Sequence, residues 1–307
     1  MTRLAAIDIG TNTIRMIVSE RAGRRLRPLV RRRVIVGMGR CLRETGRIGD
    51  DEFRESLSVL RAFREEMDRL GVGRYRACGT ACLREASNRE TFRAAAQDEG
   101  LEVEVIGPAE EAGLAWEGIR TGVAGRPGDL AMDIGGGSTE FAAGPGEGDS
   151  VSIPTGVVVL SALIPLSDPP EPWEVRAVAF FAARRIEDGA RAFGRRRFRR
   201  LIGTAGTFTT LAALDRRMTR YDPDRINGAR LSAASVRRWS DRLCRMTDSQ
   251  RLRLPGMEKG RERYIVPGVL LAREAIRRFG VEGLTVSDAG LLEGILATIA
   301  KNGGEEA

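Results

Sequence analysis

The chain of 307 residues contains no histidine. Histidine is the usual general base of serine and cysteine hydrolases and the commonest ligand of catalytic transition metals. Its absence excludes Ser-His-Asp and Cys-His nucleophile systems, His-ligated metal centres and phosphohistidine chemistry. Any general base must therefore be an aspartate, glutamate, lysine, tyrosine or cysteine.

Lysine is almost as scarce, because Lys259 and Lys301 are the only two. The positive charge is thus carried by arginine, and the formal net charge is +8 at pH 7. A guanidinium binds phosphate oxygens in pairs, so this composition favours a polyanionic partner. Arginines are densest at 31–33 and in the Arg195–Arg200 run, whose function stays open. No nucleic-acid motif with interleaved aromatic residues accompanies them, so we expect no specific nucleic-acid binding.

Long apolar runs are also missing. None reaches the roughly 18 residues that a membrane span requires, and the N-terminus does not have the shape of a signal peptide. We therefore expect a cytoplasmic protein that does not bind membranes. The four cysteines lack the spacing and the histidine partners of a zinc site, so we interpret them as small buried residues in a reducing compartment.

Two segments of the chain repeat one pattern. Leu4–Val18 and Leu130–Ala143 each contain an apolar run, then Asp-x-Gly, small polar residues and a second apolar run. This pattern predicts a strand, a tight turn and a returning strand, with Asp8 equivalent to Asp133 and Thr13 to Ser138. A single Asp-x-Gly is usually only a hairpin turn. Two copies with the same flanks favour a phosphate clamp, because glycine lets backbone N–H groups approach phosphate oxygens.

The order of predicted elements also repeats. A Gly-rich segment at 122–128 separates two halves, each with a hairpin followed by alternating strands and helices. We therefore predict an α/β fold with domains at 1–124 and 125–307 and an active-site cleft between them. The C-terminal helix at about 291–307 is a candidate to pack back on the first domain.

Several motifs together resemble the exopolyphosphatase / guanosine pentaphosphate phosphatase (Ppx/GppA) family over the full length of the chain. They are Asp8-Ile-Gly-Thr-Asn-Thr13, Gly79-Thr-Ala-Cys-Leu-Arg84, Glu110-Glu111-Ala112, Asp133-Ile-Gly-Gly-Gly-Ser-Thr-Glu140 and Gly203-Thr-Ala-Gly-Thr207. The resemblance implies two ribonuclease-H-like domains of the actin, sugar kinase and heat-shock chaperone ATPase superfamily. It also implies Mg²⁺-dependent hydrolysis of terminal phosphoanhydride bonds in inorganic polyphosphate, in guanosine pentaphosphate (pppGpp), or in both.

The resemblance further implies roles for individual residues. Glu111 matches the catalytic glutamate, and Asp133, Glu140 and Asp8 match residues near the metal. The implied phosphate- and substrate-binding residues are Asp8, Gly10, Thr11, Asn12, Thr13, Arg84, Gly135, Gly136, Gly137, Ser138, Gly203, Gly206 and Thr207. The expected cofactor is Mg²⁺, with Mn²⁺ as an alternative and a monovalent cation as a further candidate. The expected partners are polyphosphate or (p)ppGpp and a second copy of the chain in a homodimer.

Two positions depart from the family pattern. Asn227 stands where the family often has histidine, and Leu292 aligns loosely where it often has arginine. Two further function classes stay open, which are a catalytically weak (p)ppGpp or nucleotide sensor and a kinase of the same superfamily. The preference between polyphosphate and pppGpp also stays open.

Overall fold

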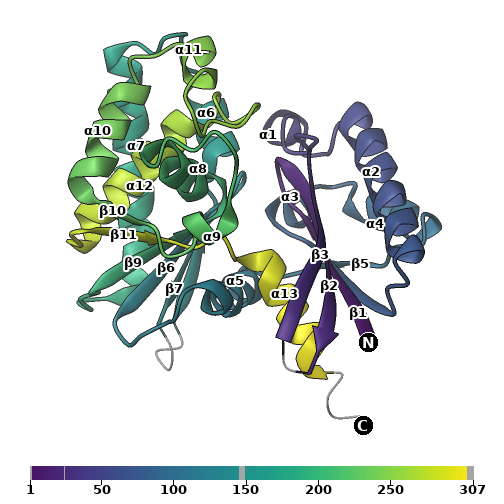
Figure 1. The fold of residues 1–307 in the computed structure, drawn as a ribbon. Coiled ribbons are helices and arrows are strands. Elements are labelled where there is room, and N and C mark those ends of the chain that lie inside the picture. Colours follow the sequence, from purple (N-terminus) through teal and green to yellow (C-terminus); the bar gives the residue numbers. More distant parts are fainter. Residues whose placement is uncertain (1, 24, 145–148, 303–307) are drawn as a thin grey trace. The chain divides into compact units, whose positions relative to one another are not determined.

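The computed structural model describes residues 2–23, 25–144 and 149–302. The chain divides into two units, one made of Met1–Gly118 with Leu291–Ala307 and the other of Ile119–Gly290 (Figure 1). Each unit has a β-sheet of its own. The predicted division after residue 124 lies in the segment that joins α5 to β6.

The first unit contains a five-stranded sheet in the order β3-β2-β1-β4-β5. Strands β1, β2 and β3 are antiparallel, whereas β4 and β5 run parallel to β1. The elements of this unit are β1 (Thr2–Ile9), β2 (Thr13–Ala22), β3 (Arg25–Ile35), α1 (Leu42–Thr45), α2 (Asp50–Arg69), β4 (Arg74–Gly79), α3 (Ala81–Glu85), α4 (Arg89–Asp98), β5 (Val103–Val105), α5 (Pro108–Gly122), within which the division falls, and α13 (Leu291–Asn302).

Strand β1 is buried on both faces, and its side chains alternate between two hydrophobic clusters. Ala5, Ile7 and Ile9 belong to the cluster that contains the apolar faces of α2 and α4. Leu4 and Ala6 belong to the cluster formed with α13 and the start of α5. The same alternation places Asp8 on the face of the sheet that α5 and α13 cover.

The second unit repeats this architecture with one added edge strand. Its sheet has the order β10-β11-β9-β6-β7-β8, in which β6, β7 and β8 are antiparallel and β9 and β11 run parallel to β6. The elements are β6 (Asp129–Ile134), β7 (Thr139–Ala143), β8 (Ser150–Ile153), α6 (Val157–Leu163), α7 (Pro172–Ala190), a 3-10 turn (Arg191–Phe193), β9 (Arg200–Thr204), α8 (Ala205–Asp215), α9 (Pro223–Ile226), β10 (Arg230–Ser232), α10 (Ala233–Leu243), α11 (Asp248–Leu252), α12 (Ile265–Phe279) and β11 (Gly283–Val286). Both sheets have the strand order of a ribonuclease-H-like domain, which confirms the predicted fold class.

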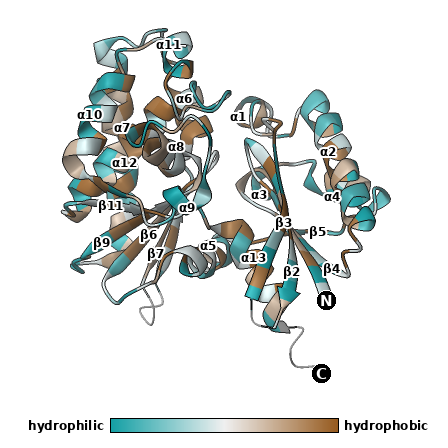
Figure 2. Ribbon diagram, viewed as in Figure 1, coloured by the Kyte–Doolittle hydropathy of each residue, from teal (hydrophilic) through white to brown (hydrophobic). Residues whose placement is uncertain are grey.

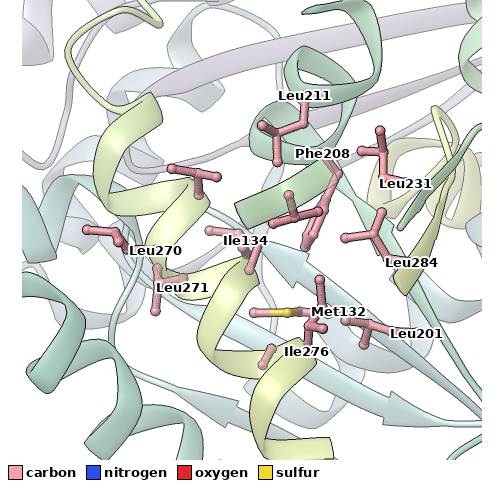
Figure 3. Close-up of a cluster of buried hydrophobic side chains, with 14 of the residues drawn as sticks. Met132, Ile134, Leu201, Phe208, Leu211, Leu231, Leu270, Leu271, Ile276 and Leu284 are labelled. Atoms are coloured by element: carbon pink, nitrogen blue, oxygen red, sulfur yellow. The ribbon is translucent and has the colours of Figure 1, made fainter. Parts of the chain in front are cut away.

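One large hydrophobic cluster fills the second unit. Met132 and Ile134 of β6 pack with Phe208 of α8 and with the buried face of α12, as Figure 3 shows. Helix α8 is buried almost throughout, whereas α2 and α10 each have an apolar and a polar face, visible as brown and teal in Figure 2. The alternation on β6 leaves Ala131 and Asp133 on the opposite face of the sheet.

Three of the four cysteines are buried as expected, namely Cys78, Cys82 and Cys244, whereas Cys41 is half-buried because it lies in the loop before α1. Burial raises the pKa of both the Cys78 and the Cys82 thiol to about 12, which is the condition of inert structural cysteines. In the part of the chain that the structure describes, no helix combines the length and the apolar character that a bilayer span needs.

The contact between α13 and α5 allows a test of the first unit. A Cβ atom at Gly294 would lie 1.8 Å from the backbone oxygen of Leu114. We expect Gly294→Ala to lower the free energy of unfolding by about 1–3 kcal/mol, because the two backbones must separate. Urea denaturation followed by circular dichroism measures this change.

Gly113→Ala is the matched control, because a Cβ atom at Gly113 in α5 meets nothing within 4 Å. Alanine there should raise the stability by about 0.5–1 kcal/mol through its better helix propensity. Equal stabilities for the two variants would contradict the close packing of α13 on α5.

Candidate functional site

Three loops of the first unit meet at one edge of its sheet. Strands β1, β4 and β5 are parallel, so their carboxyl ends lie at the same edge, where open α/β sheets bind ligands. The 10–13 turn follows β1, the segment that ends at Arg84 follows β4, and the segment that ends at Glu111 follows β5. The structure thus brings all the predicted site residues of this unit to one edge.

The turn after β1 is closed and held by main-chain hydrogen bonds. The N–H of Gly10 donates to the carbonyl oxygen of Thr13 at 3.0 Å. The carbonyl oxygens of Thr11 and Asn12 accept from N–H groups of residues 36, 37 and 39. Carbonyl and following N–H groups of a trans peptide point in opposite directions. The N–H groups of Asn12 and Thr13 therefore point away from the 36–39 segment, as anion binding requires.

Asp8 is buried and paired with a cation. It is only 3% exposed, and Arg15, its direct partner on β2, donates Nε to Asp8 Oδ2 at 2.8 Å. This bond holds the guanidinium beside the turn and occupies a carboxylate that the sequence analysis assigned to a metal. Arg15 was not among the predicted site residues.

Glu111 lies in the first turn of α5, is 8% exposed and accepts a hydrogen bond at 2.7 Å from Arg84 Nη1. Arg84 Nη1 also donates to the backbone oxygen of Ile106, so it joins the end of α3 to the start of α5. The neighbouring Glu110 is half exposed and is bound by Arg76, which also binds Glu104. The two adjacent glutamates therefore differ, since Glu111 is buried among the site residues and Glu110 belongs to a surface ion-pair cluster.

The second unit has the same layout. Strands β6, β9 and β11 are parallel, and their carboxyl ends lead into the 135–138 turn, the 203–207 segment and Ser287 with Asp288. In the first of these, the N–H of Gly135 donates to the carbonyl oxygen of Ser138 at 3.0 Å, as in the first unit. A Cβ atom at Gly10 or at Gly135 would lie at the same distance, 3.2 Å, from the equivalent carbonyl oxygen.

The start of helix α6 holds this second turn. The N–H groups of Val157 and Val158 donate to the carbonyl oxygens of Gly135 and Gly136 at 3.0 and 2.9 Å. This contact needs a glycine at position 156, because a Cβ atom there would lie 2.4 Å from backbone atoms of Gly135 and Gly136. The N–H groups of Gly136 and Gly137 consequently point away from α6. Sequence reasoning missed Gly156, for which a glycine before an apolar run was the only local signal.

Asp133 and Glu140 are direct partners on β6 and β7, so their side chains lie on the same face of the sheet. Glu140 is 3% exposed and accepts from the Ser152 hydroxyl at 2.7 Å. Two facing carboxylates repel each other unless a cation lies with them, and Mg²⁺ is commonly held by one or two carboxylates plus substrate phosphates and water. The residues therefore fit a Mg²⁺ ion that phosphate oxygens help to coordinate. Among the residues described, no cluster of three or more His, Cys, Asp or Glu side chains has metal-binding geometry.

The 203–207 segment forms a tight strand-to-helix turn. Ala205 has a φ of 68°, and a Cβ atom at Gly203 would lie 2.4 Å from the Phe208 ring. Arg261 Nη1 donates to the carbonyl oxygen of Gly206 at 2.7 Å. Thr207 packs so closely on α12 that a Cβ atom at Gly268 would lie 2.4 Å from its hydroxyl. The predicted residues of this segment thus have well-defined structural contacts.

The departures from the family pattern also have structural roles. Asn227 Oδ1 accepts from the N–H of Asp288 at 2.8 Å and so holds the loop after β11. Leu292 is buried in the cluster between β1 and α13. Within the Arg195–Arg200 run, Arg196 pairs with Asp149 at 2.6 Å, and Arg200 pairs with Asp129.

Comparison with known proteins gives one consistent result. A sequence model of the Ppx/GppA phosphatase family matches residues 16–302. Exopolyphosphatase 2 of Mycobacterium tuberculosis is 35% identical over 317 residues, which cover 98% of this chain and 99% of that protein. The crystal structure of an exopolyphosphatase from Cytophaga hutchinsonii superposes with a TM-score of 0.91 at 28% identity and covers 98% of both chains. The Ppx/GppA family member of Aquifex aeolicus gives a TM-score of 0.85 at 29% identity and covers 99% of both chains.

Gly156→Ala tests whether the α6 contact positions the second turn. The added methyl group must push α6 from the turn, so we expect phosphate release to fall about tenfold or more, because small misplacements of site groups are costly. The folded state should persist, with a stability loss of about 1–3 kcal/mol. Gly73→Ala is the control, since a Cβ atom there meets nothing within 4 Å. Unchanged turnover in a folded Gly156→Ala variant would remove this contact from the function.

Proposed function

Because this chain belongs to the Ppx/GppA phosphatase family, it is a phosphoanhydride hydrolase, and we propose that it releases terminal phosphate from inorganic polyphosphate in a Mg²⁺-dependent reaction. The observation that carries this proposal is the pair of matching turns, whose carbonyl oxygens are bound on one side and whose N–H groups point to the other. Phosphoryl transfer depends mainly on positioning and charge neutralisation, which backbone N–H groups and arginines supply.

Glu111 is the proposed general base. Its carboxylate accepts a proton from the attacking water while the water oxygen bonds to the terminal phosphorus. The bridging P–O bond breaks in the same step, so that orthophosphate is released and the shortened chain leaves with the bridging oxygen as a terminal phosphate oxygen. Arg84 positions this carboxylate through the bond from Nη1 and presents a guanidinium beside it. A carboxylate in the first turn of a helix is favoured in its charged form by the helix dipole, which keeps it able to accept a proton.

Asp133 and Glu140 are the proposed Mg²⁺ residues. The bound ion would neutralise phosphate charge in the transition state. Asp8 has a different environment, because Arg15 donates two hydrogen bonds to one of its oxygens. We therefore assign Asp8 to holding Arg15 at the first turn, where the guanidinium can bind phosphate oxygens, and we give it at most an indirect part in metal binding.

The substrate is tested by measuring phosphate release from long-chain polyphosphate and from pppGpp side by side, with Mg²⁺ and without an acceptor. We expect release from polyphosphate, and hydrolysis of pppGpp to ppGpp is the second activity that the family name suggests. Phosphate transfer only in the presence of an acceptor would identify a kinase. Tight (p)ppGpp binding without turnover would identify a sensor. Either of these two results would overturn the proposal.

Substitution of the two adjacent glutamates tests the general base. Glu111→Gln removes the proton acceptor but keeps the shape and the hydrogen-bonding capacity of the side chain. We expect kcat to fall by about 10²–10⁴ while polyphosphate binding persists. Glu110→Gln is the matched control and should retain most of the activity, because Glu110 binds only Arg76 at the surface among the contacts described. A near-normal kcat for Glu111→Gln would remove Glu111 from the mechanism.

The metal assignment is tested by titrating Mg²⁺ into Asp133→Asn and Asp8→Asn. For Asp133→Asn we expect the Mg²⁺ concentration at half-maximal rate to rise by about tenfold or more, because a ligand oxygen loses its charge. For Asp8→Asn the rate should fall with a much smaller change in that concentration. Equal shifts in both variants, or no shift in either, would contradict this division between the two turns.

A further inference from the structure

An arginine-lined hollow lies beside α10 and α11 in the second unit. Its volume is about 690 Å³, within the range of small-ligand sites. Four arginines line it, together with one aspartate, one glutamine and one methionine: Arg238, Arg242, Arg245, Arg253, Asp241, Gln250 and Met246. It shares no residue with the 135–138 turn or with the 203–207 segment.

The arginines converge from two helices. Arg238 and Arg242 are at i and i+4 on one side of α10, and Arg245 comes directly after the C-terminal cap at Cys244. Arg253 directly follows α11. The attraction of cations to a helix C-terminus accounts for Arg242, Arg245 and Arg253, which lie at the ends of α10 and α11, but not for Arg238. Helix termini alone therefore do not explain why the ends of two helices and Arg238 meet at one hollow.

Their charges are not neutralised within the part of the chain that the structure describes. No carboxylate lies within ion-pair distance of Arg238, Arg242, Arg245 or Arg253 there. Arg238 donates to the Ser235 hydroxyl, and the Arg242 guanidinium lies 5.2 Å from the centre of the Trp239 ring. The one acidic residue of the lining, Asp241, accepts from Arg273 at 3.4 Å. Like charges at i and i+4 destabilise a helix, so an anion in the hollow would relieve the repulsion between Arg238 and Arg242.

The walls of the hollow are fixed by a buried arginine. Arg251 of α11 is 3% exposed, and its Nε donates to the carbonyl oxygen of Leu243, the last residue of α10, at 3.0 Å. Its Nη1 donates to Asp248 at 2.6 Å. The two helices that carry the lining arginines are thus tied together, and the hollow is preorganised for its ligand.

The lining chemistry favours phosphate chains over nucleotides. Nucleobases are usually bound by stacking on aromatic rings, and none of the lining residues is aromatic. Trp239 lies close by, but its ring is covered by Arg242 and its Nε1 donates to Asp215 at 3.0 Å. Guanidinium groups on a concave surface match the closely spaced oxygens of a phosphoanhydride chain.

We propose that this hollow binds a segment of a long polyphosphate chain at a position separate from the phosphate turns. The proposal rests on the proposed function, since it takes the same substrate class. It predicts a dependence on chain length, because only a chain that reaches both the phosphate turns and this hollow gains from the second contact.

The test compares two triple variants in the same unit. Arg242→Gln, Arg245→Gln and Arg253→Gln are combined in one variant. The control combines Arg195→Gln, Arg197→Gln and Arg199→Gln, three exposed arginines of the basic run. Both variants lose the same charge. Binding of fluorescently labelled long-chain polyphosphate is measured without Mg²⁺ over a range of salt concentrations, so that this readout does not depend on turnover.

We expect the hollow variant to raise Kd for long-chain polyphosphate by about tenfold or more and to lower the salt dependence of binding, because phosphate contacts are lost. The control should bind almost as the unchanged chain does. With Mg²⁺, KM for long chains should rise in the hollow variant alone, and turnover of tripolyphosphate should stay within about twofold, since the catalytic residues are intact.

Three results would overturn the proposal. The first is an unchanged Kd in the hollow variant. The second is an equal loss of polyphosphate affinity in both variants, which would indicate attraction by total charge. The third is displacement of labelled polyphosphate by a short RNA at a lower concentration than by unlabelled polyphosphate. Absence of any phosphate release from the unchanged chain would overturn the proposed function instead, and the binding comparison would still decide the role of the hollow.

Discussion

The arrangement of the candidate site depends on the hydrogen bonds that hold the carbonyl oxygens of the two Asp-x-Gly turns. In the first unit the donors are N–H groups of residues 36–39, and in the second they are the first N–H groups of α6. A peptide group whose oxygen is fixed must direct the neighbouring N–H the other way. These bonds require two glycines outside the turns, since side chains at Gly39 or Gly156 would collide with the turn residues. The anion-binding character of each turn is therefore set by a segment well beyond the repeated motif.

Strand alternation then determines which side chains accompany the turns. Asp8 shares a face with Leu4 and Ala6, which pack with α13, and Asp133 shares a face with Ala131. The alternate residues of both strands fill the hydrophobic clusters on the opposite faces. A register shift of one residue would exchange the carboxylates with the core side chains. In the first unit, β4 and β5 run parallel to β1 and end at the same edge of the sheet, so Arg84 and Glu111 reach that edge from α3 and α5. The strand register that buries the core therefore also determines where the site residues lie.

The two turns share a backbone geometry but differ in charge. The residue opposite Asp8 is Arg15, whereas the residue opposite Asp133 is Glu140. The first pair is neutral overall and directs a guanidinium toward the turn. The second pair has two carboxylates on one face of the sheet, whose mutual repulsion a bound cation would reduce. Both turns thus keep N–H groups suited to anions, and in our proposal the second pair of side chains adds a cation that accompanies them.

The sequence was sufficient for the repeated fold, because apolar alternation and the Asp-x-Gly turns are local signals. The Asp8–Arg15 pair could also have been predicted from the sequence. Arg15 follows Asp8 by as many residues as Glu140 follows Asp133, so an alignment of the two repeats places Arg15 opposite Glu140. The contact of Gly156 with Gly135 and Gly136 could not be predicted from the sequence, because it depends on the length of the hairpin that separates them. The hollow beside α10 could not be predicted either. The sequence shows arginines at 238, 242, 245 and 253 among many others, and the packing of α11 on α10, which includes the bond from Arg251 to Leu243, places Arg253 beside the other three. Where arginine is this abundant, composition indicates a polyanionic ligand, and tertiary packing decides which arginines meet it.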